Sequence, residues 1–307
     1  MNYTLHQLQV FLKITNTLSI TKAAEELHLT QPAVSIQLKN LQDQFEIPLT
    51  EIIGRQLYVT DFGKEIAIAA ENIINEVNAI NYKTMAFKGN LSGKLKLSIV
   101  STGKYVMPYY LTEFLKKNIN VELEMDVTNK TKVIESLKKN EVDFALVSII
   151  PKDLDLFSEV LLENKLVLVG NSNIEFNSEK DFNSRLHNLP LLYRENGSAT
   201  RLSMESYFKD KHVKSRMTIQ LTSNEAVKQS VLAELGISLM PIIGLKNELD
   251  EGKIKIFKVD GLPIITNWRL IWLKGKKLSP VANSFIEYVQ SEKENIKKNN
   301  FSWINDY

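Results

Sequence analysis

The 307-residue chain contains no cysteine. This absence excludes disulfide bonds, thiolate metal sites and cysteine nucleophiles. No apolar run approaches the ~20 residues of a membrane-spanning helix, and the first residues lack the basic start and apolar stretch of a signal peptide. From these absences we expect a cytoplasmic protein that has no membrane partner.

An excess of basic charge is also absent. The chain has 38 Lys and Arg residues against 36 Asp and Glu residues, which gives a formal net charge of +2. Residues 1–60 contain four basic and five acidic side chains, so this segment has a net charge of −1. A positive footprint is the usual electrostatic signature of nucleic-acid binding, and composition alone does not supply it.

Residues 19–41 form the most informative stretch, because their pattern predicts two helices joined by a tight turn. Ser19 and Thr30 are N-cap residues at suitable positions, and Pro32 falls in the first turn of the second helix, where its missing N–H costs nothing. Apolar residues recur at helical spacing on both helices: Ala23, Ala24, Leu27, Val34, Leu38, Leu41 and Phe45. This is the layout of a helix-turn-helix whose second helix enters a DNA major groove, although two short helices also occur in many all-α proteins.

The residue sequence of this stretch favours the helix-turn-helix over two short helices of an ordinary all-α protein. Residues 23–35, AAEELHLTQPAVS, resemble the N-terminal signature of LysR-type transcriptional regulators. The resemblance implies a winged helix-turn-helix over residues 1–60 that binds double-stranded DNA. Helix N-termini and backbone N–H groups can hold phosphates where lysines are few. The implied DNA-contacting residues are Thr30, Gln31, Pro32, Ser35, Ile36, Lys39 and, in the wing, Arg55.

The chain departs from the family pattern near the wing. The family usually shows Leu-Phe-x-Arg at the wing entrance, where this chain has Leu-Thr-Glu-Ile over residues 49–52. Ile36 stands where arginine is common, and Glu46 where glycine is common. These changes remove phosphate contacts and alter the shape expected for the wing, a short hairpin around Gly54.

Residues 62–87 are predicted to form one long helix, about 39 Å in length at ~1.5 Å per residue. Apolar positions that alternate by four and three indicate a coiled-coil seam; an ordinary amphipathic helix is the alternative. The seam residues are Ile66, Ala70, Ile73, Val77 and Ile80. We expect this linker helix, with its flanking residues 61–90, to dimerise the chain, as a homodimer or within a homotetramer.

From Lys94 onward, strands and helices alternate, which is typical of an α/β domain with a parallel sheet. The overall fold class is therefore α/β, and the Lys/Asn-rich tail after Glu292 is expected to fray. The family resemblance implies a two-lobed effector-binding domain over residues 91–307, similar to periplasmic solute-binding proteins. Its lobe one would comprise residues 91–163 and 268–295, and its lobe two residues 164–267. Two stretches, 101–108 and 193–201, resemble regulators of carbon-fixation genes in particular.

Small polar residues gather where strands end and helices begin, which is where open α/β sheets bind ligands. They are Ser101, Thr102, Thr128, Asn129, Ser148, Ser198, Thr200, Thr222 and Ser223. Arg194 and Arg201 can pair with a carboxylate or phosphate. Each residue alone is more often a helix cap, but their convergence predicts a cleft for a small anionic effector: a phosphorylated sugar, a nucleotide cofactor or a dicarboxylate.

The sequence thus predicts a transcriptional regulator whose DNA binding responds to a small anionic metabolite, acting at the nucleoid with RNA polymerase as a candidate partner. Two other classes of protein share part of this pattern. A solute-binding or carrier protein would not need residues 1–88. An enzyme is disfavoured because no Ser-His-Asp set, paired acids or Gly-rich nucleotide loop occurs. The four histidines show no metal-ligand spacing, and we expect neither a metal nor another cofactor.

Overall fold

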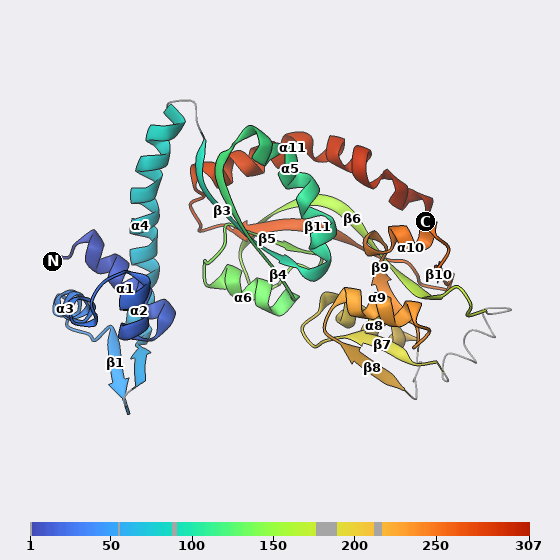
Figure 1. The fold of residues 1–307 in the computed structure, drawn as a ribbon, viewed down its shortest axis with the longest axis horizontal. Coiled ribbons are helices and arrows are strands. Elements are labelled where there is room, and N and C mark those ends of the chain that lie inside the picture. The colour runs from blue at the N-terminus through green and yellow to red at the C-terminus, as the bar shows by residue number, and fades with distance from the viewer. Residues whose placement is uncertain (1, 55, 88–90, 176–188, 212–216) are drawn as a thin grey trace. The chain divides into compact units, whose positions relative to one another are not determined.

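The computed structural model describes residues 2–54, 56–87, 91–175, 189–211 and 217–307 (Figure 1). The chain divides into two compact units, Met1–Asn90 and Leu91–Tyr307, and each is described by itself. Within the described residues, no helix is both long and apolar enough to cross a lipid bilayer.

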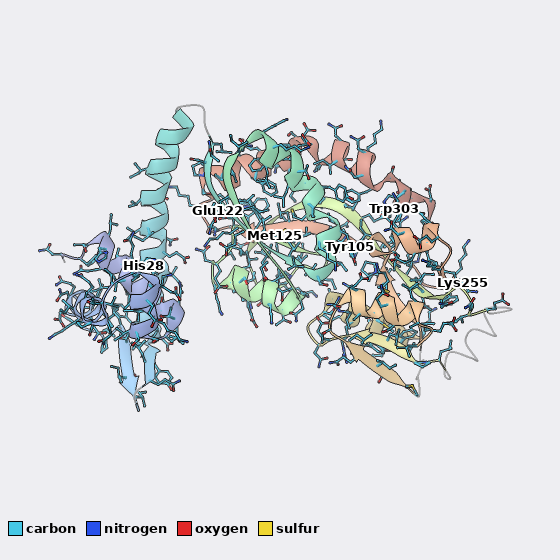
Figure 2. All side chains as sticks on the ribbon, viewed as in Figure 1. His28, Tyr105, Glu122, Met125, Lys255 and Trp303 are labelled. Atoms are coloured by element: carbon cyan, nitrogen blue, oxygen red, sulfur yellow. The ribbon has the colours of Figure 1, made fainter. Side chains whose placement is uncertain are left out.

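The N-terminal unit consists of three short helices, a hairpin and one long helix. A capping box starts the first helix, because Thr4 Oγ1 accepts from the Gln7 backbone N–H and the Gln7 side chain accepts from the Thr4 N–H. The turn before the third helix contains His28 (Figure 2) with a left-handed φ of 54°, a conformation that histidine tolerates better than most residues. The elements are α1 (Leu5–Thr17), α2 (Ile20–Glu26), α3 (Gln31–Gln42), β1 (Thr50–Ile53), β2 (Gln56–Val59) and α4 (Asp61–Phe87).

One core holds the three short helices together. Ala23 and Ala24 of α2 are buried against Val34 and Leu41 of α3, and their small side chains let the two helices cross closely. The predicted helix-turn-helix and the hairpin around Gly54 are confirmed, since Gly54 has a φ of 57° between β1 and β2.

The long helix α4 contributes to the same core, which changes the interpretation of the predicted seam. Ala70 is only 1% exposed and Ile66 packs beside it, so these two residues are occupied within their own chain. Ile73 is 39% exposed and Ile80 63% exposed. Of the predicted seam residues, Ile73 and Ile80 are thus left exposed, and Ile68, which the seam pattern did not include, is 58% exposed as well.

The C-terminal unit is built on a seven-stranded sheet with a two-stranded parallel sheet, β7–β8, beside it. Its elements are β3 (Ser92–Val100), η1 (Ser101–Tyr105), α5 (Met107–Lys117), β4 (Asn120–Thr128), α6 (Lys130–Lys138), β5 (Phe144–Val147), β6 (Leu156–Asn171), β7 (Leu191–Arg194), α8 (Ala199–Asp210), β8 (Thr218–Leu221), α9 (Asn224–Leu232), β9 (Ser238–Pro241), η2 (Ile242–Gly244), α10 (Lys246–Asp250), β10 (Ile254–Ile256), β11 (Ile264–Leu273), α11 (Pro280–Phe301) and η3 (Ser302–Asp306).

The large sheet is mixed, which corrects the expectation of a parallel one. Strand β3 pairs in parallel with β4 and β5, but β6 pairs antiparallel with β9, β10 and β11. The long strands β6 and β11 run side by side from one lobe to the other (Figure 1). Each strand continues through a predicted lobe boundary, between residues 163 and 164 in β6 and between residues 267 and 268 in β11. Two paired strands satisfy there the backbone hydrogen bonds that a loop would leave unmade.

The C-terminal tail is ordered helix rather than a frayed end, so that prediction is wrong. Helix α11 continues to Phe301, and Ile296, Phe301 and Ile304 are all at most 8% exposed. The Phe301 ring meets the Tyr109 ring edge-on at 5.1 Å, and Lys165 Nζ donates to the Ile304 carbonyl at 3.1 Å. The many lysines and asparagines of the tail made it look solvated in the sequence, although its few apolar residues recur at helical spacing and are buried.

Candidate functional site

The exposed surface of α3 carries most of the residues predicted to contact DNA. Thr30 caps the helix by accepting from the Ala33 backbone N–H at 3.4 Å. Gln31, Pro32 and Lys39 are exposed and Ser35 is half-buried. Ile36, also predicted, is 56% exposed, and Arg55 lies outside the described residues. The N-terminal half of α3 is therefore open to a partner, as a helix that enters a groove must be.

The hairpin β1–β2 is fixed to the end of α3 by one side chain that the sequence did not single out. Gln42 Oε1 accepts from both the backbone N–H and the hydroxyl of Thr50, at 3.1 and 3.0 Å. The hairpin exposes two apolar side chains, with Ile52 70% and Ile53 61% exposed, and the polar Glu51 and Gln56 are exposed beside them. The described part of the wing thus offers no cation to DNA phosphates, in keeping with the departure seen in the sequence.

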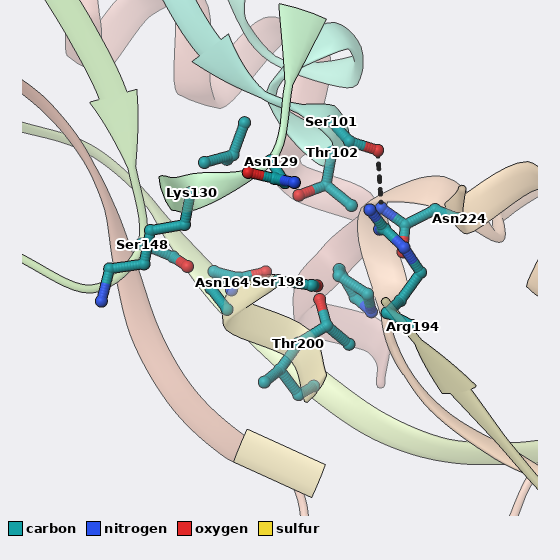
Figure 3. Close-up of a pocket in the computed structure, with 14 residues that line it drawn as sticks. Ser101, Thr102, Asn129, Lys130, Ser148, Asn164, Arg194, Ser198, Thr200 and Asn224 are labelled. Atoms are coloured by element: carbon teal, nitrogen blue, oxygen red, sulfur yellow. Dashed lines mark hydrogen bonds between the residues drawn. The ribbon is translucent and has the colours of Figure 1, made fainter. Parts of the chain in front are cut away.

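A polar pocket lies where the two lobes of the C-terminal unit face each other (Figure 3). Its walls come from the ends of β3, β4, β5 and β7 and from the starts of α6, α8 and α9. The lining residues are Val100, Ser101, Thr102, Asn129, Lys130, Ser148, Asn164, Leu166, Arg194, Ser198, Ala199, Thr200, Asn224 and Pro241. The cavity volume is about 20 Å³, close to what a single water molecule needs, so the lobes are closed onto each other here.

Seven residues of the predicted ligand set line this pocket. They are Ser101, Thr102, Asn129, Ser148, Arg194, Ser198 and Thr200. Ser101, Thr102, Asn129 and Ser148 come together because β3, β4 and β5 are neighbouring parallel strands whose carboxyl ends share one edge of the large sheet. Arg194, Ser198 and Thr200 end or follow β7 of the small sheet, and they line the same pocket from the other lobe.

The other four predicted ligand residues do not line the pocket. Thr128 precedes Asn129 in extended chain, where successive side chains point in opposite directions. Ser223 caps α9 by accepting from the Ala226 N–H at 3.0 Å, and Thr222 beside it is exposed. Arg201 donates to Glu205 Oε1 at 2.7 Å and to the Arg194 carbonyl at 2.9 Å, so it supports the pocket from outside.

Three further polar residues of the pocket are not in the predicted ligand set, namely Lys130, Asn164 and Asn224. Lys130 follows the predicted Asn129, and Asn224 ends the stretch that supplied Thr222 and Ser223. Asn164 lies on β6, where its Nδ2 donates to Thr266 Oγ1 on β11 at 2.9 Å. Lys130 and Asn224 adjoin predicted residues and could have been found from helix starts, whereas only the pairing of β6 with β11 places Asn164.

The cationic groups of the pocket differ in how they are neutralised. Arg194 is 4% exposed and pairs with Glu195 through two hydrogen bonds of 2.8 and 2.9 Å. Lys130 makes no ion pair with any residue that the structure describes, and burial lowers the pKa of its ammonium group. Lys130 is thus the less neutralised of the two cations, with Asp153 as the acidic group that acts on it from a distance.

Several buried polar groups of the pocket lack a hydrogen-bond partner. The Oδ1 atoms of Asn164 and Asn224 are buried and unpaired, while the Asn224 amide N–H donates across the lobes to Ser101 Oγ at 3.2 Å. The hydroxyls of Thr102, Ser198 and Thr200, on residues at most 8% exposed, make no hydrogen bond to a described residue. Such groups cost free energy unless a ligand or water satisfies them.

Both units match descriptions of known protein families. The bacterial regulatory helix-turn-helix protein, lysR family, matches residues 5–64, and the LysR substrate binding domain matches residues 88–294. The HTH-type transcriptional activator CmpR of Synechocystis is 36% identical over 95% of this chain and 97% of its own length. The RuBisCO operon transcriptional regulator of Allochromatium vinosum is 33% identical over 95% of this chain and 97% of its own length. These relatives match the carbon-fixation subgroup that the sequence resembles.

Solved structures agree with this assignment. The regulatory domain of Synechocystis CcmR in complex with 2-PG (2-phosphoglycolate) is 30% identical, with a TM-score of 0.61, over 66% of this chain and 99% of that one. Full-length CbnR in complex with its target DNA shares the fold, with a TM-score of 0.61 at 18% identity over 94% of this chain and 99% of that one. The chain therefore belongs to the LysR family of bacterial transcriptional regulators.

Proposed function

We propose that this chain regulates transcription by binding DNA as a dimer or tetramer, and that a small phosphorylated anion in the interlobe pocket modulates this binding. The observation that carries the proposal is the pocket, in which Lys130 forms no ion pair with a described residue and the hydroxyls of Thr102, Ser198 and Thr200 make no hydrogen bond to one. The relation to CcmR, whose regulatory domain is described with 2-PG, supports a phosphate. The carrier alternative is not favoured, because residues 5–64 match a helix-turn-helix, and we propose no catalytic activity.

The chemistry of the pocket suits an anion with several oxygens. The starts of α6, α8 and α9 all lie at its wall, and the free N–H groups at helix starts favour negative charge. Hydroxyls of Thr102, Ser198 and Thr200 can donate to phosphate oxygens. The unpaired Oδ1 atoms of Asn164 and Asn224 require donors instead, which favours an acid that also carries a hydroxyl group.

We propose that binding opens the cavity, because its volume of about 20 Å³ is close to what one water molecule needs and a phosphorylated acid has several times as many atoms. The ligand would then favour a wider separation of the lobes than the one seen here. It can shift the oligomer only by the difference between its affinities for the two arrangements. In this way occupancy of the pocket would change how the DNA-binding units are spaced on an operator.

The remaining assignments follow from the family and stay proposals. We propose that α4 dimerises the chain through Ile73, Val77 and Ile80, that the regulator acts in the cytoplasm at the nucleoid, and that it contacts RNA polymerase when bound to DNA. We also propose the domain boundaries predicted from the sequence: a DNA-binding domain of residues 1–60, a linker helix of residues 61–90 and an effector domain of residues 91–307.

Calorimetry on the full chain tests the pocket. 2-Phosphoglycolate and 3-phosphoglycerate, which adds a hydroxyl group, are titrated into the parent, Lys130→Gln and Thr102→Val. We expect the parent to bind. Lys130→Gln should weaken the binding of both ligands, and Thr102→Val should weaken it by about 1–3 kcal/mol, because the groups that the Thr102 hydroxyl would pair with are left without a hydrogen bond. Thr218→Val on the exposed face of β8 is the matched control. Binding that neither pocket variant weakens would place the ligand elsewhere.

A further inference from the structure

An exposed isoleucine occupies the centre of the outward face of α3. Ile36 is 56% exposed, although isoleucine is among the residue types most often buried. It follows Val34 by two positions and precedes Leu38 by two, and both of these lie in the core. At about 100° per residue, Ile36 therefore lies almost diametrically opposite the buried face.

The neighbours of Ile36 complete a small surface of mixed character. Pro32, one turn earlier, and Lys39, nearly one turn later, are exposed. Lys39 forms no ion pair with any residue in the described ranges, so its charge is available to a phosphate. A helix that enters the major groove with this face would bring an apolar side chain, rather than a hydrogen-bonding one, against the bases.

Only one group on the base edges of the major groove matches such a side chain. Guanine, cytosine and adenine present donors and acceptors there, whereas thymine adds a C5 methyl group. Covering a donor or acceptor with an isoleucine would leave it unpaired at a cost, but covering a methyl group is favourable. We infer that Ile36 is a specificity-determining residue that contacts the methyl group of a thymine in each operator half-site. This inference rests on DNA binding through α3.

The test starts from an operator that the full-length chain selects from a random DNA pool. Each thymine is then replaced singly by uracil, which lacks only the methyl group and keeps the pairing edge. For the parent, one thymine in each half-site should stand out, with affinity falling about fourfold per methyl group lost. The variant Ile36→Ala should bind the unmodified operator more weakly and should show no further loss at that thymine.

A control variant and the outcomes that would refute the inference complete the test. Leu235→Ala removes an apolar side chain of similar exposure, 51%, from the other unit, and it should keep the parent's uracil pattern. The inference fails if no uracil replacement weakens the parent, or if Ile36→Ala loses as much affinity as the parent at the same thymine. A pool that yields no preferred sequence would also overturn it, since a specificity contact requires sequence preference. Parent-like operator binding by Ile36→Ala would assign this face to a partner other than DNA.

Discussion

Gly197 should be the position where one added methyl group reports on the contact between the lobes. Its φ of +86° lies in the left-handed region, and an ideal Cβ there would stand 2.6 Å from Thr131 Oγ1 of α6 and 3.3 Å from Thr131 Cβ. Ordinary contacts begin near 3.4 Å, so Gly197→Ala must displace Thr131 or part the lobes. Backbone strain and overpacking add to each other in this variant.

The two contributions can be separated because the same unit contains a matched control. Gly252 has a φ of +67° with nothing within 4 Å of an added Cβ, so Gly252→Ala should show the backbone cost alone, about 1–2 kcal/mol. Gly197→Ala should lose a further ~1–3 kcal/mol through overpacking. At about 2–4 °C per kcal/mol for a unit of this size, its Tm should fall at least ~2 °C below that of Gly252→Ala.

Thermal unfolding followed by circular dichroism measures both variants, alone and combined with Thr131→Ala. Removing the Thr131 hydroxyl should reduce the extra loss of Gly197→Ala and leave the loss of Gly252→Ala unchanged. Equal midpoints for the two glycine variants would refute the reasoning, because they would show that the lobes do not meet at this contact in solution.

Three further predictions concern other parts of the chain. Ile73→Asp with Val77→Asp would bury charge in the proposed dimer surface of α4, so sedimentation should show a smaller species; unchanged association would rule this surface out. Phe301→Ala should destabilise the C-terminal unit by about 3–5 kcal/mol in urea unfolding, whereas a frayed tail would give almost no change. Burial lowers the pKa of Lys130, so its ammonium loses its proton at a lower pH than that of an exposed lysine, and anion affinity should decline at a lower alkaline pH than an exposed lysine would allow. That decline should vanish in Lys130→Gln, and a decline retained there would assign the titration to another group.

Local sequence patterns specify the helices and strands and most of the polar residues that line the pocket. Helix caps, the Ala23–Ala24 pair and the spacing of Val34, Leu38 and Leu41 specify the helix-turn-helix, because capping and amphipathic period are properties of neighbouring residues. Polar residues at strand ends likewise predicted seven members of the pocket lining, since ligands of open α/β sheets bind where strands end and helices begin. The outward position of Ile36 also follows from the helical period alone.

Tertiary structure decided what depends on residues far apart in the chain. Asn164 joined the pocket only because β6 pairs with β11, which places it opposite Thr266, and no local pattern encodes that register. Ala70, predicted to lie in the coiled-coil seam, is instead buried in the core of its own unit. An apolar stripe on a helix does not specify which surface will cover it. The C-terminal tail became helix for the same reason. Its apolar residues are few, and only burial against distant partners such as Tyr109 and Lys165 offsets the conformational entropy of ordering it.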